Sequence, residues 1–88
     1  MNIEEAIKRV SSLKANIERC QNISSKITRD VPKGRPVCTT FMDRSLVDLD
    51  RDDLIAFLRY QAEKNMAEII RIQHVIDMAN AALKGILQ

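Results

Sequence analysis

Two segments of the chain repeat apolar residues at spacings of three and four, and this periodicity limits the fold more than any other feature. In residues 3–28 the mean spacing is about 3.4 residues, nearer the heptad value than that of a straight helix. It predicts an amphipathic helix that wraps left-handed against a partner helix, with Asn2 suited to cap its first turn. The stripe consists of Ile3, Ile7, Val10, Leu13, Ile17, Cys20, Ile23 and Ile27.

The second segment, residues 50–87, predicts a longer helix. Asp50 suits the N-cap position, and Asp53 stands where a capping box has an acidic residue. An interruption near residues 64–65 is considered, because Asn65 and its neighbours favour a helix interior only weakly. The apolar positions have a mean spacing of about 3.6 residues; they are Leu54, Leu58, Ala62, Met66, Ile69, Ile72, Ile76, Ala79, Leu83 and Ile86.

The connector, residues 29–49, begins with a turn that contains Pro32, Gly34 and Pro36. Residues 37–42 are β-branched and apolar, which is typical of an extended segment or a lone strand, although no pairing strand is evident. At about 20 residues, the connector is long for a link between two helices. Because its apolar residues can be buried, we expect it to pack on the helices; these residues are Val37, Phe41, Met42, Leu46, Val47 and Leu49.

These segments predict an all-α fold in which residues 1–88 form one domain, an antiparallel two-helix hairpin with a long second helix and a packed connector. Helices of about 38 Å and about 57 Å leave about 20 Å of the second helix uncovered by the first. We expect the connector to cover that part. Phe57 and Tyr60, which lie off the apolar stripe near the start of the second helix, would then meet Phe41, Met42 and Leu46.

The predicted apolar surface exceeds what two helices can hide, because a two-helix monomer of this size has a thin core. A homodimer would bury more of it in a four-helix bundle with crossing angles of about 20°. Asn65 lies in the centre of the stripe, where a buried Asn fixes register at some cost in stability. Alternatively, the helix opens there and Asn65 is hydrated. The candidate core and register residues are Asn65, Met66, Ile69 and Ile76.

Charge is nearly balanced overall, with a formal net charge of +2, but it separates locally. The basic turn carries Arg29, Lys33 and Arg35, which could meet phosphate or an acidic protein surface. A solvated turn is the simpler interpretation. An acidic cluster follows at the start of the second helix, where it complements the helix dipole better than it fits a metal site; it consists of Asp48, Asp50, Asp52 and Asp53.

Residues that catalysis would require are not grouped in the sequence. His74 is the only histidine, whereas a metal site needs more ligands and a general base needs a pocket and an orienting partner. No phosphate-binding, dinucleotide-binding or zinc-protease motif occurs. Cys20 is expected to be a buried thiol, while pairing of Cys38 with Cys20 and a reactive Cys38 thiol both stay open. We therefore expect no enzyme, no catalytic residue, no metal and no cofactor.

The sequence favours a non-enzymatic protein–protein interaction module, an adaptor, regulatory subunit or inhibitor that acts through its helix faces and connector. The alternative is an accessory factor that contacts nucleic acid through the basic turn at residues 29–35. With no apolar run of membrane-spanning length and no apolar leader, we expect a cytoplasmic protein with no membrane contact. The candidate partner-binding residues are Arg29, Lys33, Arg35, Phe41, Met42, Phe57 and Tyr60.

Overall fold

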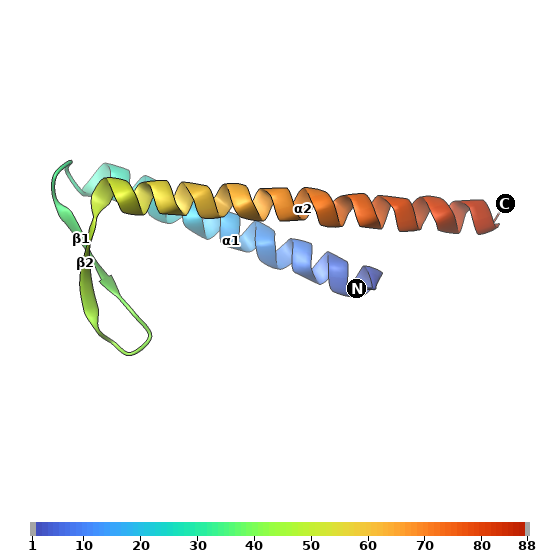
Figure 1. Ribbon diagram of the computed structural model, residues 1–88, viewed down its shortest axis with the longest axis horizontal. Helices are drawn as coiled ribbons and strands as arrows, with labels where there is room; N and C mark the ends of the chain where they lie inside the picture. Colours follow the sequence, from blue (N-terminus) through green and yellow to red (C-terminus); the bar gives the residue numbers. More distant parts are fainter. Residues whose placement is uncertain (1, 88) are drawn as a thin grey trace.

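A computed structural model describes residues 2–87 of the chain, and the side chains of residues 2–85. Helix α1 (Ile3–Asp30) and helix α2 (Arg51–Leu87) run antiparallel, and strands β1 (Pro36–Thr40) and β2 (Leu46–Asp50) connect them (Figure 1). The predicted helical hairpin with a long second helix is confirmed. The fold is not purely α-helical, however, because a small two-stranded sheet lies between the helices. The side chain of Ile86, the last residue of the predicted stripe, lies outside those described.

Both helices begin at the caps that the sequence predicts. Asn2 Oδ1 accepts a hydrogen bond of 2.8 Å from the backbone N–H of Glu5, which satisfies a donor that the first turn of α1 leaves free. At the start of α2, an Asp50 carboxylate oxygen accepts from the N–H of Asp53 at 3.0 Å. Helix α2 then continues unbroken through Asn65, so the interruption considered at residues 64–65 is absent.

The connector forms a β-hairpin, and the expectation that its apolar segment lacks a pairing strand is wrong. Strands β1 and β2 pair antiparallel from Pro36 opposite Asp50 to Thr40 opposite Leu46. The pairing strand is the second half of the same connector. A Pro32–Arg35 turn, in which Gly34 adopts a φ of 83°, leads from α1 into β1.

The turn between the strands has no glycine, and polar side chains shape it instead. Asp43 Oδ1 accepts hydrogen bonds from the Ser45 hydroxyl at 2.6 Å and from the Ser45 N–H at 2.9 Å. Arg44 adopts a left-handed φ of 66°, which is uncommon for a residue other than glycine. The Phe41 N–H donates to the Ser45 carbonyl at 3.0 Å and closes the turn.

The β-hairpin projects from the closed end of the helical pair and does not pack along it (Figure 1). Phe41, Met42 and Leu46 are all exposed. The expectation of a packed connector that covers Phe57 and Tyr60 is therefore wrong, because pairing between β1 and β2 satisfies the inward backbone groups of the β-hairpin while its outer edges face water. The uncovered part of α2 is instead its C-terminal end, beyond the start of α1.

The core is a single layer of side chains between the two helices. Val10, Leu13 and Ile17 of the predicted α1 stripe are buried, but Ile7 and Ile23 are exposed. The buried positions of α1 follow alternating steps of four and three residues that begin at Ala6. Ile7 and Ile23 do not fall on this series and lie beside the buried stripe. The contiguous core cluster comprises Ala6, Val10, Leu13, Ile17, Ile69, Ile72 and Ile76, with Ala62 against it.

A buried arginine closes the base of the helical hairpin. Arg51, the first residue of α2, is only 7% exposed. Its Nε donates to the Val31 carbonyl at 2.6 Å and its Nη2 to the Thr28 carbonyl at 3.2 Å, while Nη1 pairs with Asp52 at 2.7 Å. A cation is favourable at a helix C-terminus, where carbonyls lack helical partners. Arg51 therefore ties the start of α2 to the end of α1.

Replacement of Arg51 by Met is expected to lower the free energy of unfolding by about 2 kcal/mol, because hydrogen bonds from a charged donor to two carbonyls are lost. Urea denaturation at fixed protein concentration measures the change. The control is Arg19→Met at an exposed position of α1, which should stay within about 0.5 kcal/mol of the parent. Equal effects of both substitutions would contradict this role of Arg51.

The hairpin turn is expected to depend on pH through Asp43. The Ser45 hydroxyl, and to a smaller extent the Ser45 N–H, donate to the Asp43 carboxylate. These hydrogen bonds hold the pKa of Asp43 below its ordinary value. Because the folded pKa is lowered, the contribution to stability is complete above about pH 4, the unfolded value. It is lost as the pH falls through the folded pKa. NMR titration should show Ser45→Ala raising the pKa of Asp43, and an unchanged value would refute this.

Candidate functional site

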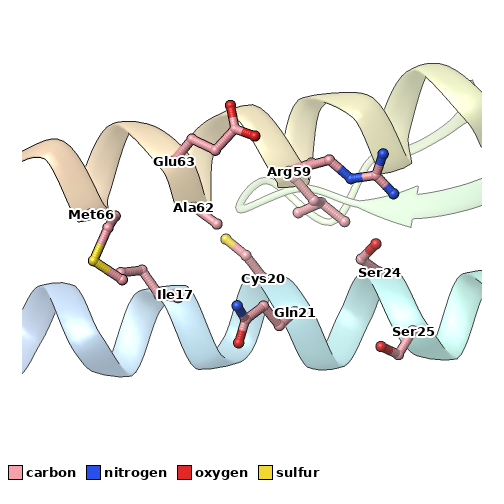
Figure 2. A pocket seen from close by; sticks show the side chains of 10 residues that line it. Ile17, Cys20, Gln21, Ser24, Ser25, Arg59, Ala62, Glu63 and Met66 are labelled. Atoms are coloured by element: carbon pink, nitrogen blue, oxygen red, sulfur yellow. The ribbon is translucent and has the colours of Figure 1, made fainter.

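An open groove of about 420 Å³ lies between the two helices, toward the closed end of the helical hairpin (Figure 2). Small side chains at the helix interface, Cys20 and Ser24 of α1 and Ala62 of α2, leave this space unfilled. Arg59 and Glu63 lie along its α2 rim, while Gln21 and Ser25 lie along its α1 rim. The groove was missed from the sequence, although the step from bulky residues to Cys20 and Ser24 was its signal.

The groove and its surroundings offer few side chains suited to catalysis or metal binding. Cys20 is buried and Cys38 is exposed, and both are free thiols, so the pairing considered between them does not form. His74 is exposed on α2. Within residues 2–87, no three histidine, cysteine or acidic side chains come together as a metal site would require.

Helix α2 carries large apolar side chains on faces that α1 does not cover. Phe57 and Tyr60 are each 58% exposed, and Val75 and Met78 are similarly exposed. Phe57 and Val75, like Tyr60 and Met78, are about five helical turns apart and so project from the same side of α2, about 27 Å from one another. We call these four residues the outer strip.

Two cations interrupt the outer strip midway. Lys64 and Arg71 are exposed and fall on the same side of the helix as Phe57 and Val75. Glu68 lies on this side too, but Arg9 of α1 pairs with its carboxylate at 3.1 Å. The strip therefore has an apolar pair at each end and, between them, two cations that are unpaired among the described residues. Met66 and Ile70 add exposed apolar surface on the opposite flank of α2, so that α2 is apolar on more sides than α1 can cover.

Arg29, which the sequence predicts in the basic turn, lies instead in the last turn of α1, and its charge is paired with a neighbouring residue. Arg29 Nε donates to Asp30 Oδ1 at 2.9 Å, and this hydrogen bond and charge pairing raise the pKa of Arg29 and lower that of Asp30. Lys33 and Arg35 are exposed. Arg51, which sequence reasoning missed, lies nearby but is buried against α1 carbonyls and adds no accessible charge.

The predicted partner-binding residues fall into three separate regions. Arg29, Lys33 and Arg35 lie from the last turn of α1 to the start of β1. Phe57 and Tyr60 lie on α2, and Phe41 and Met42 lie in the turn between β1 and β2. Phe41 is 49% exposed and Met42 fully exposed. The structure therefore does not assemble them into one site.

Asn65 is buried rather than hydrated, with 5% of its surface exposed. Its Oδ1 accepts a long hydrogen bond of 3.5 Å from Gln61 Nε2, and its Nδ2 has no hydrogen-bond partner among the described residues. Ile69 and Ile76 are buried in the core beside α1, but Met66 is exposed. Asn65, Ile69 and Ile76 thus belong to the interface between α1 and α2, and their role in a dimer stays a prediction.

Comparison of the chain with protein-family models, with curated proteins and with solved structures finds no match. None of the helices in the described residues is long and apolar enough to cross a membrane.

Replacement of Asn65 by Leu is expected to raise the free energy of unfolding by about 1–2 kcal/mol, because it removes a buried donor that has no partner. The half-buried Gln61 can turn its amide to water. Urea denaturation compares this variant with Asn80→Leu, a substitution at an exposed position of the same helix. The Asn80 variant should change little, and a less stable Asn65→Leu protein would contradict the assignment.

Proposed function

We propose that the chain is a non-enzymatic protein–protein interaction module whose outer strip binds a helical segment of a partner protein. The observation that supports this proposal is the distribution of apolar residues on α2. Among residues 2–85, more large apolar side chains are exposed than buried. A helix that is apolar on several sides is typical of one covered by more than one neighbour, and exposed apolar patches mark interaction sites.

The charges of the outer strip indicate the chemistry of its partner. Phe57 and Tyr60 at one end, and Val75 and Met78 at the other, require apolar side chains opposite them. The exposed cations between the two pairs favour acidic side chains in the middle of the partner segment. We therefore expect an amphipathic partner helix with apolar ends and an acidic centre.

A second copy of this chain fits the outer strip less well. In an antiparallel pairing of two strips, Lys64 of one copy would lie opposite Arg71 of the other. In a parallel pairing each cation would face its own counterpart, and like charges in contact oppose association. The predicted dimeric four-helix bundle stays a prediction, and this charge pattern argues against the strip as its interface.

The alternative partner, nucleic acid, has less support. The hydrogen-bonded pair of Arg29 with Asp30 leaves Lys33 and Arg35 as the unneutralised cations of the basic turn. Proteins that bind nucleic acid depend on several such contacts to phosphate. The free thiols Cys20 and Cys38 fit a reducing compartment, and we propose that the module acts in the cytoplasm.

Affinity capture from the native host tests the proposal. The double variant Val75→Glu, Met78→Glu should recover the bound partner at least tenfold less than the parent chain, because it adds charge to the apolar end of the strip. The control places two glutamates at the exposed positions Gln73 and Asn80, on the opposite flank of α2. This control should recover the partner normally.

Circular dichroism establishes that each bait keeps its helices, so that lost capture reports the surface and not unfolding. Equal recovery by the parent and the strip variant would refute the proposal. So would nuclease-sensitive capture that is lost in Lys33→Ala, Arg35→Ala and retained in the strip variant, since that result identifies the basic turn as the binding site.

A further inference from the structure

We infer that the free edge of β1 pairs with β1 of a second copy of this chain, in antiparallel orientation, to form a four-stranded sheet. This inference is independent of the proposed role of the outer strip, because it concerns the β-hairpin alone. Among residues 2–87 the sheet has only β1 and β2. An isolated two-stranded sheet is marginally stable in water, and additional strands with an apolar face stabilise it.

Each strand leaves a defined set of backbone groups without a partner. The Phe41 N–H donates to the Ser45 carbonyl, and this pair is in register with the strand pairing. Because inward and outward groups alternate along an antiparallel strand, Thr39 directs its N–H and C=O toward β2. Cys38 and Thr40 direct theirs to the open side of β1.

Charge distinguishes the two open edges. The outward-directed positions of β2 include Asp48 and Asp50, so pairing of β2 with another β2 would bring carboxylates together, which is destabilising. Charged residues on an edge strand are a usual protection against such pairing. Strand β1, from Pro36 to Thr40, contains no charged residue, and only Pro36, at its first position, lacks an N–H. β1 is therefore the edge open to pairing.

A second copy satisfies this edge symmetrically. With Cys38 opposite Cys38 of the other copy, a two-fold axis perpendicular to the sheet brings the two β1 strands into full overlap, and each β2 lies outermost. The side chains of Val37, Thr39, Val47 and Leu49 share one face of each hairpin, as the register requires. The two-fold axis keeps these faces on the same side, where they form one continuous apolar surface.

The fold leaves room for this pairing. The β-hairpin projects away from both helices (Figure 1), and within residues 2–87 β1 pairs only with β2. Two copies can therefore join through their hairpins without bringing their helices into collision. A foreign extended peptide would also satisfy the backbone groups, but it would not supply the matching apolar face that a second hairpin brings.

Proline substitutions test the edge. Thr40→Pro removes an outward N–H from β1 and spares the bonds between β1 and β2. Asp48→Pro is the matched control, because it removes an outward N–H from β2. We expect light scattering to give twice the 10.0 kDa chain mass for the parent and for Asp48→Pro at micromolar concentration, whereas Thr40→Pro should weaken dimerisation at least tenfold.

Cysteine chemistry supplies a second measurement. Hydrogen-bonded antiparallel partners have Cα atoms about 5.5 Å apart. Their Cβ atoms are too far apart for an unstrained direct disulfide, but the two Cys38 thiols lie within reach of a short bismaleimide. A short bismaleimide, which adds one Cys38 thiolate at each end and needs no oxidant, should therefore link two chains through Cys38, with Cys20 excluded by burial. Thr40→Pro should slow this cross-linking at least tenfold, in proportion to the weakened dimerisation.

Three results would overturn the inference: a monomeric parent, a dimer weakened equally by Thr40→Pro and Asp48→Pro, or a dimer that does not cross-link through Cys38. The strip variant Val75→Glu, Met78→Glu should dimerise as the parent does. Failure of the edge pairing and failure of the proposed strip function are thus distinguishable, since each has its own variant and its own readout.

Discussion

The contact between the Arg51 guanidinium and the last carbonyls of α1 is the interaction on which the rest of the arrangement depends. It joins the end of one helix to the start of the next, although a connector of two strands separates them in sequence. A buried charge is tolerated only when its donors are satisfied, and here two carbonyls and Asp52 satisfy them. The contact brings the helices together at one end and leaves the β-hairpin outside the interface.

Beyond this closed end, a single seam of side chains holds the helices together. Ile69, Ile72 and Ile76 pack against the α1 stripe, and Asn65 interrupts the seam with an amide whose hydrogen bonding is incomplete. In the part of the chain that the structure describes, no second layer of side chains covers α2. An interaction module needs an accessible apolar surface. The single-layer core limits the stability of the helical hairpin, but it also leaves the apolar faces of α2 exposed for the proposed binding.

The sequence predicted correctly the features that depend on residues close together in the chain. The caps at Asn2 and Asp50 and the buried stripe around Leu13 depend on residues close in sequence. The β-hairpin was missed because its turn uses Asp43 and Ser45 side chains with Arg44 at positive φ, instead of the glycine that usually signals a hairpin. Arg51 was missed because its burial depends on carbonyls twenty and more residues away. The wrong expectation that Phe41 would meet Phe57 followed from the missed β-hairpin.

The extended shape of the chain also has a consequence for valency. The molecule measures 62 × 26 × 15 Å, with the β-hairpin at one end and the uncovered turns of α2 at the other (Figure 1). Joining two copies through their hairpins would leave Val75 and Met78 of each copy far from the junction. Such a pair would present two binding strips at once, and a partner with two matching helices would then bind by avidity, at a strength set by its linker as well as by either contact.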